Sequence, residues 1–133
     1  MSVLKRPEEA GSLKVGSFII IDDEPCKIVS IDKSKAGKHG SAKVRIVALG
    51  IFDGKKRSYV GPADAQVEVP IIEKKVGQVI SVSSSSIQLM DLSSYEIFDV
   101  PTPEEPELKD KLTSGVEVEY WEIMGRKKII RVK

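Results

Sequence analysis

Apolar and polar residues alternate along most of the chain. In the segment VEVEYWEI at 116–123, Val116, Val118, Tyr120 and Ile123 face one way while the glutamates face water. This alternation predicts a half-buried antiparallel strand. Alternating or β-branched runs of the same kind predict strands at 15–21, 26–31, 42–52, 67–69, 76–82, 87–90, 95–99, 116–123 and 128–132.

Short turn signals separate these runs, and one segment has a helical pattern. The turn signals are DDEP, FDGKKR, VGPADA, SSSS and IMGRKK. In TPEEPELKDKLTSG, Thr102 fits a helix N-cap, Pro103 the first helical position, and Glu105 the third position of a capping box. We therefore predict one short helix over 103–113, with Pro106 limiting its regularity and Gly115 ending it.

Many short strands at close spacing predict an all-β fold of small barrels or a sandwich. The charge balance changes sign near Pro70, with 12 Lys/Arg against 9 Asp/Glu up to that residue and 9 against 11 after it. A proline and a charged cluster in VEVPIIEKKVG also interrupt the apolar runs there, although a proline at a strand edge gives the same pattern. We predict two domains, 1–70 and 71–133.

Composition narrows the class of protein. Apolar residues make up 41% and charged residues 31%, which is typical of a soluble globular protein, and a net charge of +1 excludes a uniformly basic coat. The N-terminus lacks the apolar core of a secretory signal, and the longest apolar run is the four residues 18–21, so we expect a cytoplasmic protein with no membrane partner. Cys26 is the only cysteine, which excludes an intrachain disulfide and predicts a small core residue.

Positive charge gathers in the segment KSKAGKHGSAK at 33–43. From 33 to 52 there are five basic residues and no acidic one, between two predicted strands. Gly37 to Gly40 fit a type I turn with Lys38 and His39 at its two central positions. We predict a β-hairpin whose stem is lined by four cations, namely Lys33, Lys35, Lys43 and Arg45.

Three site chemistries can be compared with this hairpin. A P-loop requires Ser or Thr after the lysine, whereas Lys38 is followed by His39. A metal site requires ligands beyond His39, which is the only histidine, and catalysis has only Cys26 or Ser41 as a loose partner for it. Phosphate contact by clustered lysines fits, and so does a solvated tip that protects a sheet edge. From the residues alone, both interpretations remain open.

The string SKAGKHGSAKVRIVALGIFDGKK resembles the signature of the translation initiation factor 5A family, whose bacterial relative is elongation factor P. The resemblance continues through VPIIEKKVGQVISV, IQLMDLSSYEIFDVPTP and GVEVEYWEIMGRKKII, so it covers nearly the whole chain, in the shorter archaeal form. It implies an N-terminal SH3-like β-barrel, which carries the lysine loop, and a C-terminal OB-fold β-barrel.

The resemblance also implies a covalent modification and no separate cofactor. In this family the lysine between the glycine and the histidine, here Lys38, receives an aminobutyl group derived from spermidine. Deoxyhypusine synthase is the implied modifying enzyme, and the product is deoxyhypusine or, after hydroxylation, hypusine. Position 41 is serine where many relatives have a second histidine, which bears on the contacts of that side chain but leaves Lys38 unaffected.

The implied function is that of a non-enzymatic translation factor. It binds the ribosome, contacts ribosomal RNA and peptidyl-tRNA through the modified Lys38, and promotes peptide-bond formation at stalling sequences such as polyproline. The implied RNA-contacting residues of the loop are Lys33, Lys35, Gly37, His39, Gly40, Ser41, Lys43 and Arg45.

Two alternatives remain. The first is a general single-stranded RNA-binding module that works through the OB-fold. Its segment is net negative, and its aromatic residues, Tyr95, Phe98, Tyr120 and Trp121, are scattered along the sequence. The second is an enzyme that uses His39, for which the sequence offers no supporting set of residues.

Overall fold

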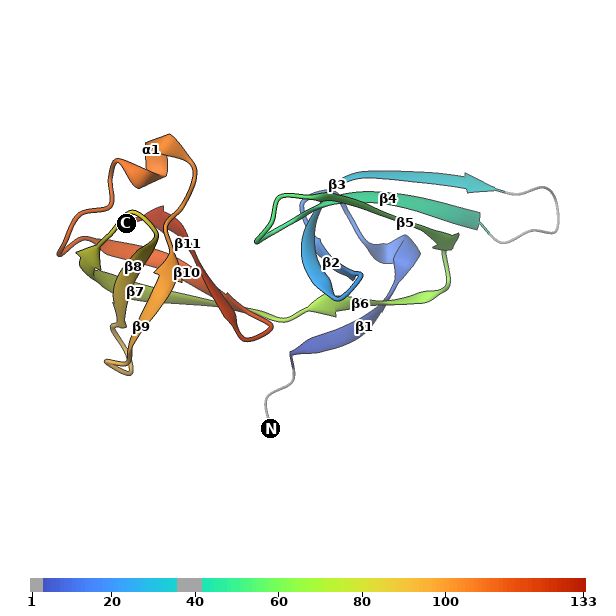
Figure 1. Cartoon of the computed structure of the whole chain (residues 1–133). Coiled ribbons are helices and arrows are strands. Elements are labelled where there is room, and N and C mark those ends of the chain that lie inside the picture. Colours follow the sequence, from blue (N-terminus) through green and yellow to red (C-terminus); the bar gives the residue numbers. More distant parts are fainter. Residues whose placement is uncertain (1–3, 36–41) are drawn as a thin grey trace. The chain divides into compact units, whose positions relative to one another are not determined.

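The chain is all-β with one short α-helix, as predicted, and the computed structural model describes residues 4–35 and 42–133 (Figure 1). It divides into two compact units, Met1–Ile71 and Ile72–Lys133, called here the N-terminal and C-terminal units. Each unit has its own cluster of buried apolar side chains. Within the described residues, no helix is long and apolar enough to cross a membrane.

The N-terminal unit contains two antiparallel sheets that enclose one core. The sheets have the orders β2-β3-β4-β5 and β1-β6, in the arrangement expected of an SH3-like barrel. The elements are β1 (Lys5–Glu9), the 3-10 helix η1 (Ala10–Ser12), β2 (Phe18–Ile21), β3 (Glu24–Lys35), β4 (Ala42–Gly50), β5 (Lys56–Pro62) and β6 (Gln66–Pro70).

Strand β4 supplies the centre of this core because its side chains alternate between core and solvent. Val44, Ile46 and Ala48 are at most 1% exposed, while the residues between them face outward. Cys26 on β3 lies in the same cluster and is fully buried, which confirms it as a core residue. Burial raises the pKa of the Cys26 thiol.

The C-terminal unit is one curled five-stranded sheet of order β11-β10-β7-β8-β9. Strand β11 also approaches β9 without pairing with it, so the sheet curls into the partly open barrel expected of an OB-fold. The elements are β7 (Ile72–Val82), β8 (Ser86–Asp91), β9 (Ile97–Pro101), α1 (Pro106–Lys109), β10 (Glu117–Ile123) and β11 (Arg126–Val132). On β10, Val118 and Tyr120 are buried in the core of this unit, as the alternation predicted. Ile123 is also buried, but it lies an odd number of positions from Tyr120 and outside that cluster, so the alternation does not account for it.

Two tight hairpins show how short turn signals set strand register. Asp22 and Asp23 join β2 to β3 with φ of 53° and 63°, and Met124 and Gly125 join β10 to β11 with φ of 50° and 79°. Two consecutive residues with positive φ form the type I′ turn whose twist matches paired strands. The turn signals DDEP and IMGRKK are therefore confirmed.

Two strands were missed by the sequence pattern. β1 is KRPEE, which has no apolar alternation, and it forms because β6 pairs with it. β5 overlaps the ends of FDGKKR and VGPADA, two segments that were interpreted as turns, and its half-buried residues are Arg57, Tyr59 and Gly61. Arg57 makes two hydrogen bonds to Asp53, at 3.0 and 2.9 Å, and thereby joins β5 to the turn that precedes it.

Several predicted bounds were wrong. The strand predicted at 15–21 begins only at Phe18, the one predicted at 26–31 extends to Lys35, and the one predicted at 42–52 ends at Gly50. The predicted strand at 95–99 begins at Ile97 because Tyr95 belongs to the preceding turn. The helix predicted over 103–113 contains only Pro106–Lys109. A proline lacks an amide hydrogen and disfavours helical geometry in the residue before it, so Glu105 is extended and Pro106 must open the helix. Thr102 is not the N-cap, and its hydroxyl donates to the Ser83 carbonyl.

One buried polar cluster lies in the C-terminal unit. Asp91 is 6% exposed, and its carboxylate accepts hydrogen bonds from the amides of Ser93 and Ser94 and from the Tyr120 hydroxyl. These bonds, with the one from Tyr120 the largest effect, lower the pKa of Asp91 to about 2 although burial acts in the opposite direction. Burial, together with the bond to Asp91, raises the pKa of Tyr120. Asp91 is therefore a carboxylate that ties the β8–β9 connection to β10.

Replacing Tyr120 by phenylalanine should destabilise the C-terminal unit by about 2 kcal/mol, because a buried carboxylate loses a donor. Trp121 is the only tryptophan, so its fluorescence during urea unfolding reports on this unit. Tyr59→Phe removes a hydroxyl from the N-terminal unit and should leave the Trp121 transition unchanged. Equal urea midpoints for the Tyr120→Phe and Tyr59→Phe variants would contradict a stabilising role for the Asp91–Tyr120 bond.

The free energy of unfolding of the C-terminal unit should also depend on pH, and should fall at low pH. Because the folded pKa of Asp91 lies below its ordinary value of 3.8, its contribution is complete above about pH 5 and is lost as the pH falls towards 2. Asp91→Asn should be less stable than the wild type at pH 7, and the difference should shrink between pH 5 and pH 2. Urea midpoints at each pH measure this, with the exposed Asp99→Asn variant expected to follow the wild type.

Candidate functional site

The predicted hairpin is present as the antiparallel pair of β3 and β4 (Figure 1). Its ladder continues to the pair Lys35 and Ala42, so the two strands are hydrogen-bonded up to both ends of the segment 36–41. β2 pairs only with Glu24–Lys27 of β3, which leaves the last part of β3 paired with β4 alone. The stem therefore extends beyond β2, while β5 continues beside β4 as far as Lys43.

The register sorts the predicted stem cations onto two faces. Residues directly opposite each other in an antiparallel pair lie on the same face of the sheet. Lys33 is opposite the buried Val44, so it lies on the core-facing side. Lys43 is opposite Ser34 and Arg45 is opposite Asp32, so these two cations share the outer face, where both are exposed. The sequence had predicted that these cations line the stem as a single set, without distinguishing the two faces.

Lys33 has a structural contact. Its ammonium group donates a hydrogen bond of 2.7 Å to the carbonyl of Gly11 in η1. The amide of Gly11 in turn donates to the carbonyl of Ala63, and a Cβ added at Gly11 would lie 3.0 Å from Ala63. Only a residue without a side chain fits this approach easily. Gly11 and Ala63 are supporting residues that sequence reasoning missed, since an isolated glycine in AGS has many possible explanations.

The exposed cations Lys43 and Arg45 have polar, apolar and acidic neighbours on the outer face of the sheet. Lys43 is flanked by Ser34 and Pro62, and Arg45 by Asp32 and Val60, all on the outer face. Asp32 precedes the acid-free segment 33–52 by one residue, and the ladder brings it directly opposite Arg45. The positive surface at the stem therefore comes from Lys43 and Arg45 with one acidic neighbour.

The remaining predicted site residues lie outside the described residues or are described only in part. Gly37, Lys38, His39, Gly40 and Ser41 fall in the segment 36–41, outside the described residues. The backbone of Lys35 pairs with Ala42 at the end of the ladder. Among residues 4–35 and 42–133, no group of three or more His, Cys, Asp or Glu side chains could hold a metal ion.

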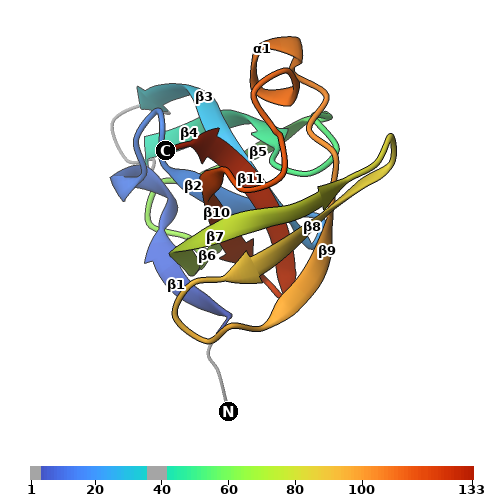
Figure 2. The same ribbon diagram turned by 90° about the vertical axis from the view of Figure 1, so that its left-hand side faces the viewer.

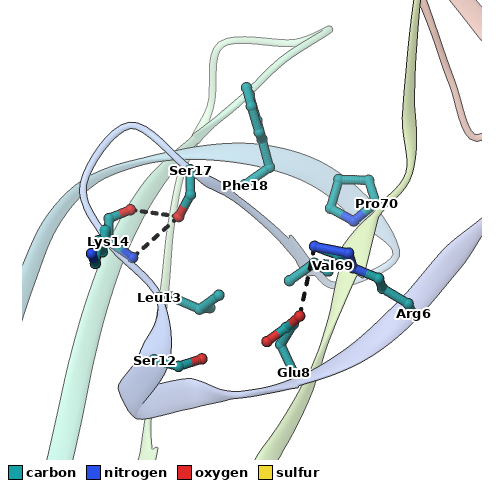
Figure 3. A pocket seen from close by; sticks show the side chains of 9 residues that line it. All are labelled: Arg6, Glu8, Ser12, Leu13, Lys14, Ser17, Phe18, Val69 and Pro70. Carbon is teal, nitrogen blue, oxygen red and sulfur yellow. Dashed lines mark hydrogen bonds and ion pairs between the residues drawn. The ribbon is translucent and has the colours of Figure 1, made fainter.

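A separate hollow of about 270 Å³ lies in the N-terminal unit (Figure 3). Leu13, Phe18, Val69 and Pro70 give it an apolar lining, which does not include Lys33, Lys43 or Arg45. Among its polar groups, Arg6 pairs with Glu8 at 3.6 Å, Ser17 bonds to the backbone of Lys14, and the Ser12 hydroxyl donates to the Glu9 carbonyl. The hollow is therefore distinct from the lysine hairpin.

Both units match known protein-family models. Residues 5–65 match the model described as translation initiation factor 5A-like, N-terminal. Residues 71–133 match the model described as eukaryotic elongation factor 5A hypusine, DNA-binding OB fold.

Known relatives match along nearly the whole chain. The translation initiation factor 5A of Thermofilum pendens is 62% identical over 128 residues, covering 96% of this chain and 97% of its own. That of Pyrococcus furiosus is 56% identical over 131 residues, covering 97% and 95%. Among solved structures, the eukaryotic translation initiation factor 5A from Methanococcus jannaschii superposes with a TM-score of 0.90 at 44% identity, covering 98% of both chains. A family protein from Naegleria fowleri has a TM-score of 0.77 at 33% identity, covering 98% and 99%.

The two faces of the stem predict different consequences for two similar substitutions. Lys33→Met should destabilise the N-terminal unit by about 1 kcal/mol, because the Gly11 carbonyl loses its donor. Lys43→Met, on the exposed face, should change stability by less than about 0.5 kcal/mol. Hydrogen exchange of the buried Ile46 amide measures both effects. Equal protection in the two variants would show that the Lys33–Gly11 bond contributes nothing to the stem.

Proposed function

The chain belongs to the translation initiation factor 5A family, and on that premise we propose that it acts on the ribosome to stabilise peptidyl-tRNA. The proposed effect is faster peptide-bond formation at stalling sequences such as consecutive prolines. Ribosomal RNA and peptidyl-tRNA are its proposed partners, and the cytoplasm is its proposed location.

The proposed working group is Lys38 carrying an aminobutyl extension. Deoxyhypusine synthase is the proposed modifying enzyme and spermidine the donor of the group. A new C–N bond forms at the lysine Nζ, the C–N bond to the aminobutyl part of spermidine breaks, and 1,3-diaminopropane is left. A lysine is a compact charge on a flexible stem, and the extension adds reach and a second amine. Both amines are cationic at neutral pH and suit phosphate oxygens or sugar hydroxyls.

The observation that carries the proposal is the ladder of β3 and β4. It is hydrogen-bonded to the pair Lys35 and Ala42, which gives the segment containing Lys38 two fixed ends. Lys43 and Arg45 are exposed near one of those ends. Fixed cations beside a tethered charged group supply electrostatic attraction to RNA without reading its sequence. Gly37, His39, Gly40 and Ser41 are proposed to complete this RNA-contacting loop with Lys35, while Lys33 supports it through Gly11.

The proposed mechanism is positioning, with the chemistry carried out by the ribosome. A poorly reactive peptidyl-tRNA loses rate when its reacting ends leave the productive geometry, and a factor that restricts those ends recovers it. The protein needs no nucleophile, base or metal of its own for this role. We assign the lysine loop to a domain of residues 1–70 and the OB-fold to residues 71–133.

A general single-stranded RNA-binding module is the weaker candidate. Such modules combine a basic groove with stacked aromatic side chains. In the C-terminal unit, the segment 76–108 contains no Lys or Arg and six Asp or Glu. Tyr120 is buried in the core, and Trp121 is already engaged with Lys74 and Glu119. These features favour a role for the lysine hairpin over one for an RNA-binding OB-fold face.

Lys38→Arg should retain the fold but abolish the rescue of polyproline synthesis, because a guanidinium replaces the amine that accepts the aminobutyl group. A reconstituted translation assay with a polyproline reporter measures the rescue. Lys14→Arg is the matched control, since Lys14 is an exposed lysine of the same unit away from the stem. Normal rescue by Lys38→Arg would overturn the proposal. Mass spectrometry of the protein from its native source should locate one aminobutyl group on Lys38.

A further inference from the structure

The connection between β8 and β9 holds an exposed aromatic residue in an unfavourable backbone conformation. Tyr95 has a φ of 63°, in the left-handed region that non-glycine residues seldom adopt. Its amide donates to the Asp91 carbonyl at 2.8 Å, and the Asp91 amide donates to the Glu96 carbonyl at 2.9 Å. The chain from Asp91 to Ile97, called here the Tyr95 turn, is therefore closed by its own backbone.

A buried group holds the Tyr95 turn rigidly. The Asp91 carboxylate accepts hydrogen bonds of 2.8 Å from the Ser93 and Ser94 amides, and its other oxygen accepts from the Tyr120 hydroxyl. The turn is thus tied to β10, in the centre of the barrel. A surface that is ordered before it binds loses less conformational entropy on binding.

The turn displays apolar surface that the fold itself does not use. Tyr95 is 69% exposed and Ile97 is 54% exposed. Ile97 lies directly opposite Met90 on the outer face of the sheet, while Phe98 and Val100 face the core. Glycine or asparagine would suit the backbone at position 95 better, so the turn alone does not account for a tyrosine. Tyrosine is among the residue types that contribute most to protein interfaces.

The charges around the Tyr95 turn are negative. Glu96 and Asp99 are exposed beside Tyr95 and Ile97, and Asp99 shares the outer face with Ile97. The six-acid segment 76–108 also includes the first three residues of α1, but α1 lies at the opposite end of the unit from the Tyr95 turn (Figures 1 and 2).

Nearby cations do not cancel this charge. Lys75 forms ion pairs with Glu73 and Glu122, at 3.5 and 3.6 Å, and Lys127 pairs with Glu122 at 3.4 Å. Lys127 also lies over the Phe98 ring, which faces the core side of the sheet. The two lysines and two glutamates of this group balance one another, so Lys75 and Lys127 do not neutralise Glu96 or Asp99.

We propose that the Tyr95 turn is a docking site for a basic protein surface, one that offers an apolar pocket to the tyrosine ring and Lys or Arg side chains to Glu96 and Asp99. An RNA partner is disfavoured because its phosphates would face these carboxylates. This inference rests on the proposed function only in placing the partner protein on the ribosome. The C-terminal unit then binds protein while the lysine hairpin of the N-terminal unit binds RNA.

The first test compares the affinity of full-length variants for purified ribosomes. Tyr95→Ala should weaken binding about tenfold or more, as expected for an aromatic anchor. Tyr95→Asn, which suits a positive φ, should weaken it equally and separates loss of the ring from any loss of the turn. Val15→Ala removes another side chain that is 63% exposed and should change the affinity less than about twofold. Wild-type affinity in both Tyr95 variants would overturn the inference.

Charge reversal distinguishes a basic protein from RNA by the sign of its effect. Glu96→Lys and Asp99→Lys should each weaken ribosome binding if the partner is basic, and should strengthen it if the partner is RNA. A photo-reactive phenylalanine analogue at position 95 should crosslink to a ribosomal protein. Crosslinks to ribosomal RNA or to a second copy of this chain, or tighter binding by the lysine variants, would overturn the inference. Failure of the wild type to bind ribosomes would overturn the proposed function, and this inference with it.

Discussion

The antiparallel pairing of β3 with β4 is the constraint on which the N-terminal unit and its candidate site both depend. One face of the pair supplies the buried Ile28, Val44 and Ile46, and so builds the core. The other face carries Lys43 and Arg45 into solvent. Because successive side chains in a strand alternate between faces, a slip of one residue in register would exchange these two sets. The apolar side chains would then face solvent, and the cations would face the core. The fold and the positive surface are therefore stabilised by the same ladder.

The two units each use a side-chain polar contact, exposed in the N-terminal unit and buried in the C-terminal unit. In the N-terminal unit, the ammonium of Lys33 bonds to the backbone of η1 and braces the stem of the hairpin. In the C-terminal unit, the buried Asp91 carboxylate organises a turn whose exposed residues are apolar and acidic. A strong polar interaction thus supports an exposed segment in each unit. This arrangement suits a protein that works by holding surfaces in place, since a preorganised surface loses less entropy when it binds.

The charge distribution follows the same division. A net charge of +1 conceals an excess of three positive charges up to Pro70 and an excess of two negative charges after it. Phosphates favour the positive part, and a basic protein surface favours the negative part. A ribosome offers RNA and basic protein side by side, so a factor with two oppositely charged units can engage both without one unit competing for the partner of the other.

The sequence by itself determined the all-β class, most strands, the buried Cys26 and the lysine hairpin, because alternation and turn chemistry are local signals. The tertiary structure decided the rest. KRPEE became β1 only because β6 lies beside it. The β3–β4 ladder separated Lys33 from Lys43 and Arg45 and brought Asp32 opposite Arg45. In the C-terminal unit, the packing of the strands joined Asp91 to Tyr120 across 29 positions. Such pairings depend on strand register and long-range contact, which no local pattern of residues specifies.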